Sequence, residues 1–86
     1  MRRIPIADVW RVLYAEELDG KAEVTPGQVR VRCPFHNDRR PSCDVHLTKN
    51  TFLCRSCGSG GGIVTLICRE LNVSADSARA WLKSHC

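Results

Sequence analysis

The first hydrophobic positions of the chain recur at helical spacing. They are Ile6, Val9, Trp10, Leu13 and Leu18. This spacing places apolar side chains along one face of an α-helix. Pro5 precedes the pattern and Gly20 follows it, as is typical of helix boundaries. The pattern therefore predicts a helix over residues 5–19, followed by a turn-rich connection over residues 21–27.

The middle of the chain alternates between apolar and polar positions. In residues 28–33, Val29, Val31 and Cys33 share one face of the predicted strand, and the polar residues share the other. Residues 43–47 alternate again, and a turn over residues 48–50 leads into residues 51–54. This pattern predicts a β-hairpin, with Cys43, Val45 and Leu47 facing away from Asp44 and His46.

The last third of the chain predicts two helices over residues 62–85. The run Gly58–Gly62 is expected to break all regular structure, and a hydrophobic helix then begins near Gly62 and ends at Asn72. Ser74 suits the N-cap of the final helix, whose buried side carries Ala78, Trp81 and Leu82. The expected fold class is α+β, with an antiparallel β-sheet flanked by helices in one domain over residues 1–86.

Composition and charge narrow the functional classes. The chain has 86 residues, with 13 Lys and Arg against 9 Asp and Glu, so its net charge is +4. This mild basic excess is compatible with nucleic-acid binding. No signal peptide and no membrane-length apolar run is recognised, which predicts a cytoplasmic protein without a membrane partner. In that reducing setting, the 6 cysteines indicate metal ligation over disulfides.

Two matched pairs of potential metal ligands bracket the hairpin. Cys33 and His36 form the first pair, and Cys54 and Cys57 form the second, each separated by two residues. A tight turn with this spacing points both side chains at one ion, and two such turns make a closed tetrahedral zinc site. We expect one structural Zn²⁺, since four ligands leave no open position. The metal would supply on the order of 10 kcal/mol to a domain whose core is small.

Other cysteines and histidines are alternative ligands. Cys43 could compete, but a small buried hydrophobe is the simpler interpretation. His46 lies between the two pairs, but its strand position is expected to point it outward. Cys68 fits a helix core, and Cys86 ends the chain.

The central stretch resembles the N-terminal zinc-binding domain of bacterial and phage DNA primases. The matching segments are Cys33-Pro34-Phe35-His36-Asn37-Asp38, Pro41-Ser42, Phe52 two positions before Cys54, and Cys54-x-x-Cys57-Gly58-x-Gly60-Gly61. The chain departs from the family pattern at Cys43, where an aromatic residue is usual, and at Gly62, where Asp or Asn is usual. The resemblance implies a zinc ribbon over residues 28–57, held by Cys33, His36, Cys54 and Cys57.

The same resemblance implies contact with single-stranded template DNA in primer synthesis. In bacterial primases this domain precedes a catalytic core with a Glu and an Asp-x-Asp pair, which this sequence lacks. We therefore expect a non-catalytic module, encoded by a bacterium or phage, that acts with a replication protein such as a primase or polymerase catalytic subunit or a helicase. The alternative is a zinc-stabilised protein–protein adaptor acting on such a replication protein.

The expected DNA contacts are basic residues on the ribbon and one aromatic platform. They are Arg30, Arg32, Lys49, Phe52, Arg55, Arg39 and Arg40. The alternative for Arg30 and Arg32 is a charged face that serves only solubility. Phe35 is a second possible platform, although packing beneath the zinc turn explains it equally well.

Overall fold

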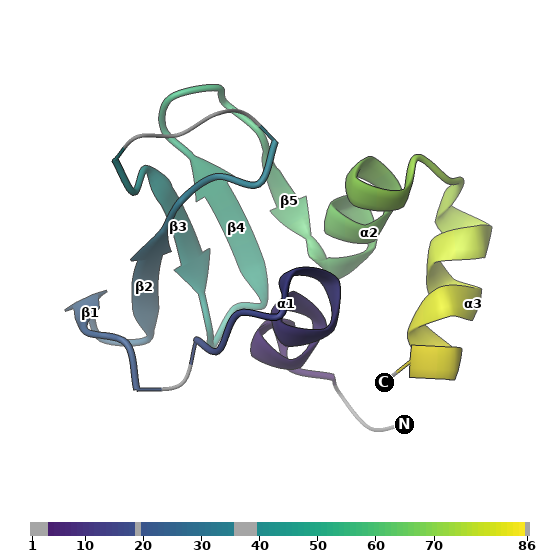
Figure 1. The fold of residues 1–86 in the computed structure, drawn as a ribbon, viewed down its shortest axis with the longest axis horizontal. Helices are drawn as coiled ribbons and strands as arrows, with labels where there is room; N and C mark the ends of the chain where they lie inside the picture. The colour runs from purple at the N-terminus through teal and green to yellow at the C-terminus, as the bar shows by residue number, and fades with distance from the viewer. Residues whose placement is uncertain (1–3, 19, 36–39, 86) are drawn as a thin grey trace.

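The computed structural model describes residues 4–18, 20–35 and 40–85, and consists of an antiparallel sheet with three helices along one side (Figure 1). In chain order the elements are α1 (Ile6–Tyr14), β1 (Glu23–Thr25), β2 (Gln28–Val31), β3 (Cys43–His46), β4 (Thr51–Cys54), β5 (Gly60–Gly62), α2 (Ile63–Leu71) and α3 (Ala75–His85). The five strands lie in sequence order, and every neighbouring pair is antiparallel. The predicted α+β class is confirmed.

The core lies between the inner face of the sheet and the helices. Val29, Val45 and Phe52 point inward from β2, β3 and β4, with exposures of 1%, 0% and 3%. Trp10 on α1 is fully buried, and its ring lies 6.5 Å from that of Phe52 in an edge-on arrangement. Leu66 on α2 is also fully buried. The predicted alternation of residues 28–33 and 43–47 therefore indicates which face of the sheet is covered.

Helix α1 is shorter than predicted. It ends at Tyr14 because Ala15 adopts a left-handed conformation, with φ 53° and ψ 34°. The acidic residues that follow would oppose the helix dipole, and Glu16 instead accepts a hydrogen bond from Trp10 Nε1 at 2.9 Å. Leu18 is still buried, at 1% exposure, but reaches the core from the loop after the helix.

Two predicted irregular segments contain short strands. Residues 23–25 form β1, where Gly27 makes the turn into β2 with φ 78° and its backbone N–H lies 3.3 Å from a Glu23 carboxylate oxygen. Gly60–Gly62 form β5 against β4, so the prediction that the glycine run breaks all regular structure is wrong there. A Cβ on Gly60 would lie 2.9 Å from the Phe52 carbonyl oxygen, so the close pairing favours glycine.

The two C-terminal helices begin and end close to the predicted residues. Asn72 ends α2 in a left-handed conformation, with φ 55°. The backbone N–H of Ser77 donates to Ser74 Oγ at 3.3 Å, so Ser74 caps α3 as expected. Ala78 is fully buried, and α3 packs against α2 on the side away from β1 (Figure 1). Within the described residues, no helix has the length and apolar character that crossing a membrane requires.

Candidate metal centre and nucleic-acid interface

Three cysteines from separate parts of the sequence meet at one end of the sheet. Cys33 follows β2, Cys54 ends β4, and Cys57 lies in the next turn. Their Sγ atoms all lie within 4.8 Å of one another, and those of Cys33 and Cys57 are 3.8 Å apart. Thiolates bound tetrahedrally to zinc at about 2.3 Å lie roughly 3.8 Å from each other. The cluster therefore suits one zinc ion.

Backbone hydrogen bonds fix the second turn of the site. The N–H of Gly58 donates to the carbonyl oxygen of Cys54 at 2.9 Å, and the N–H of Cys54 donates to the carbonyl oxygen of Ser59 at 2.7 Å. Gly58 has φ 75°, which glycine adopts readily. The closed turn keeps Cys54 and Cys57 on the same side, as the two-residue spacing predicts.

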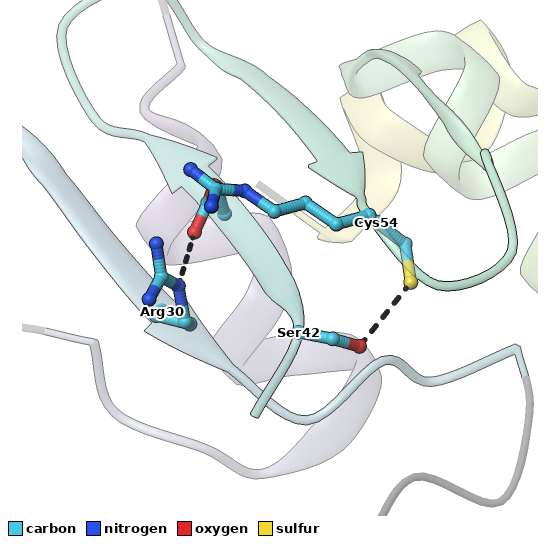
Figure 2. Close-up of polar contacts among 5 residues, drawn as sticks. Arg30, Ser42 and Cys54 are labelled. Atoms are coloured by element: carbon cyan, nitrogen blue, oxygen red, sulfur yellow. Dashed lines mark hydrogen bonds and ion pairs between the residues drawn. The ribbon is translucent and has the colours of Figure 1, made fainter. Parts of the chain in front are cut away.

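Two serine hydroxyl groups lie beside these sulfur atoms. Ser42 Oγ is 3.5 Å from Cys54 Sγ (Figure 2), and Ser59 Oγ is 3.1 Å from Cys57 Sγ. When the cysteines bind zinc as thiolates, these hydroxyls can donate hydrogen bonds to them. Such contacts orient the ligands and tune their basicity.

The electrostatics of the cluster couple zinc binding to the loss of thiol protons. Burial is the main cause that raises the pKa of the Cys33 thiol to about 12; Cys54 and Cys57 add to this rise, and a backbone hydrogen bond at Phe35 partly offsets it. The protonated thiol is therefore favoured when no ion is present. A bound zinc ion would supply the positive charge that stabilises the thiolates, in a structural role.

The remaining ligand candidates are placed differently. His36, the predicted fourth ligand, lies outside the described residues, so its role stays a prediction. Cys43 is fully buried opposite Cys54, and neither it nor His46 belongs to the sulfur cluster within the described residues. His46 lies on β3 opposite Gln28 and has its side chain on the outer face of the sheet.

Two of the predicted DNA-contacting arginines share one carboxylate. Arg30 Nε donates to Asp44 Oδ1 at 2.7 Å (Figure 2), and Arg55 Nε donates to Asp44 Oδ2 at 2.9 Å. The Asp44 side chain is 8% exposed, whereas that of Arg55 is 64% exposed. Burial alone would raise the pKa of Asp44, but the hydrogen bonds and charges of the two arginines outweigh it and lower the pKa.

Asp44 was not among the predicted site residues. The sequence did place it on the polar face of its strand, and Arg30 on the polar face of β2. The missing information was the register, which sets Arg30 directly opposite Asp44. A cross-strand pair of opposite charges is a common stabilising contact in sheets, and it would have suggested this pairing.

The other predicted contacts are spread more widely. Arg32 and Arg40 are exposed, and Arg32 directly precedes Cys33, whereas Lys49 lies in the hairpin turn at the opposite end of β3 and β4. Arg39 lies outside the described residues. Phe52 was expected to stack on bases, but its ring is buried in the core at 3% exposure, so that prediction is wrong. Phe52 shares the inward face of β4 with Cys54.

Comparisons with known proteins agree with this geometry. A family model described as a CHC2 zinc finger, the zinc ribbon of DnaG-type primases, matches residues 23–84. A DNA primase of Legionella pneumophila is 36% identical over 56 residues, covering 59% of this chain and 10% of that protein. The Gene 58 protein of Mycobacterium phage D29 is 40% identical over 42 residues, covering 49% of this chain and 33% of that protein.

A solved structure has the same fold. It is the crystal structure of the Aquifex aeolicus primase, containing its zinc-binding and RNA polymerase domains, with a TM-score of 0.75 and 30% sequence identity. The match covers 98% of this chain and 20% of that one. The chain spans about a tenth of the length of the Legionella relative, since the matched part covers 10% of it. By its sequence match, its fold and its cysteine cluster, the chain belongs to the CHC2 zinc-finger family of DnaG-type primases.

Proposed function

We propose that this chain is a zinc ribbon that binds single-stranded template DNA in primer synthesis, without a catalytic core of its own. The observation that carries the proposal is the placement of arginines beside the metal ligands. Arg32 directly precedes Cys33, and Arg55 directly follows Cys54. A zinc ion that holds Cys33 and Cys54 would therefore also hold the backbone of Arg32 and Arg55. Two exposed cations in fixed positions suit an electrostatic contact with phosphates.

The proposed module acts together with a separate catalytic part. Primer synthesis needs carboxylates that hold metal ions, and within the described residues the cluster able to hold a metal is made of cysteines. We infer that the partner is a replication protein, such as a primase or polymerase catalytic subunit or a helicase, in the cytoplasm of a bacterium or of a phage-infected host.

The test is a fluorescence-anisotropy titration of the zinc-loaded chain with a labelled single-stranded oligonucleotide at two salt concentrations. We expect affinity to fall as salt rises, with a log–log slope of roughly 0.7 for each phosphate neutralised. An Arg30→Ala/Arg32→Ala double variant should bind more weakly and with a shallower slope.

The matched control is Arg79→Ala, which removes an exposed arginine from α3, away from the sheet. It should leave DNA affinity close to that of the unmodified chain. Absence of binding at low salt by the zinc-loaded chain would overturn the proposal. A pull-down would then test the adaptor alternative, in which the same ribbon docks on a replication protein.

A further inference from the structure

The outer face of the sheet carries a shallow hollow next to the arginine pair. Its volume is about 250 Å³. Its lining includes Gln28, Asp44, His46, Thr51, Leu53 and Arg55. Gly60 and Gly62 on β5 lie opposite Leu53 and Thr51, so this side of the hollow has no side chains to close it. The zinc site uses none of the lining residues as ligands.

The two arginines are held in a defined geometry. Each uses its Nε to donate to a different oxygen of Asp44, at 2.7 and 2.9 Å. In the part of the chain that the structure describes, their terminal amino groups have no other hydrogen-bond partner. Two guanidinium groups around one carboxylate leave a net charge of +1. Planar guanidinium groups with free terminal donors match the oxygens of a phosphate.

The hollow has the size and chemistry for one planar ring. It is smaller than the roughly 300–1,000 Å³ of sites that enclose drug-sized ligands. Leu53 is 54% exposed and offers an apolar surface, while Gln28, His46 and Thr51 offer hydrogen-bonding groups. Unpaired bases are recognised by contact with a ring face together with hydrogen bonds to their edges.

We propose that this face holds a subsite for one nucleotide of an unpaired strand. Arg30 and Arg55 bind its phosphate, Asp44 acts as the positioning residue that orients both arginines, and the hollow receives the attached base. This inference rests on the proposed function and deepens it, because it assigns a single position on the ribbon where backbone and base are bound together.

Asp44→Asn tests the proposal, because two explanations predict opposite changes in DNA affinity. If only net charge mattered, removing a negative charge beside the DNA would tighten binding. If Asp44 positions the arginines, the variant should bind a ten-nucleotide thymidine oligomer roughly tenfold more weakly, as expected for losing hydrogen bonds to a charged group. Equal or tighter binding by Asp44→Asn would overturn the proposal.

Two further variants control for folding and for charge. Asp76→Asn removes a carboxylate paired with Arg79 on α3 at 3.4 Å, and should leave affinity unchanged or slightly higher. Arg30→Lys keeps the charge but lacks the Nε donor, and should bind about as weakly as Arg30→Ala. If Asp44→Asn fails to retain zinc or to fold, the comparison of Arg30→Lys with Arg30→Ala tests the proposal in its place. If Arg30→Lys bound DNA with full affinity, a positioning role for Asp44 would be excluded.

The base-binding half is tested with Leu53→Ala on two ligands. The first is the thymidine oligomer, and the second is an abasic oligomer of the same length. We expect several-fold weaker binding of the thymidine oligomer and unchanged binding of the abasic one. The base subsite would be overturned if Leu53→Ala weakened binding of both oligomers equally, or of neither. If the unmodified chain bound neither oligomer, the proposed function itself would fail. That result differs from failure of the base subsite alone, in which the unmodified chain still binds DNA.

Discussion

Cys43 on β3 lies directly opposite Cys54 on β4, so a fully buried thiol neighbours a residue of the metal site. Burial, with smaller contributions from the nearby cysteines Cys33 and Cys54, raises the pKa of Cys43 to about 12. A thiol in such a place behaves as a small hydrophobe.

Cys43→Ala should therefore retain one zinc per chain. It should lower the free energy of unfolding by about 1–2 kcal/mol, because it removes one buried atom from a packed core. Zinc content is measured by colorimetric release and stability by chemical denaturation. Cys54→Ala is the matched control on the facing strand, and it should lose zinc. A fall in zinc content for Cys43→Ala would make Cys43 a ligand.

Cys57→Ser should release zinc and unfold the domain. Zinc contributes on the order of 10 kcal/mol when it binds a small domain, more than a core of this size can replace. A chelator added to the unmodified chain should have the same effect, measured as loss of circular-dichroism signal. His46→Ala should leave one zinc per chain, since His46 is on the outer face of the sheet. Loss of zinc from His46→Ala would contradict the ligand assignment.

His36→Ala tests the fourth ligand, which the spacing and the resemblance predict. The variant should bind zinc more weakly, because three cysteines leave the tetrahedral position open. Competition with a zinc indicator measures the change, with His46→Ala as the reference variant. Unchanged zinc affinity would show that another group completes the site.

The elements that could be predicted from sequence have strong local signals. The hairpin combines alternation over residues 43–47 with a polar turn over residues 48–50, and Ser74 marks its helix start by a hydrogen-bonding side chain. The two short strands could not be predicted in this way. Gly60–Gly62 become a strand only because β4 supplies pairing partners, and a glycine run has no alternation of its own.

The site residues also differ in whether a local sequence signal predicts them. The cysteine cluster follows from spacing, because each pair lies within one tight turn. The surface contacts depend on register and on which face is buried. Phe52 lies two positions from Cys54 and shares its inward face, so the alternation already indicated burial over stacking. The pairing of Asp44 with two arginines needed the positions of three strands.

Arg69 on α2 connects the last third of the chain to the first ligand turn. Its Cζ lies 4.7 Å from the centre of the Phe35 ring, a cation–π geometry. Arg69→Gln should lower the free energy of unfolding of the zinc-loaded chain by about 0.5–1 kcal/mol. Arg79→Gln on α3 is the control, since its partner is an exposed aspartate in the same helix. Equal losses for the two variants would mean that the ring contact adds nothing.

Gly61 is the middle residue of β5, two positions before α2, and has little room for a side chain. Its φ is 146°, and a Cβ placed there would lie 2.8 Å from the Cβ of Thr65. Gly61→Ala should destabilise the zinc-loaded chain by about 2–4 kcal/mol, from backbone strain and from the clash. Gly20→Ala is the matched control, because Gly20 also has positive φ, at 87°, but a Cβ placed there would meet no atom within 4 Å. It should cost only about 1–2 kcal/mol. Chemical denaturation measures both, and equal losses would exclude the contact with Thr65 as the cause.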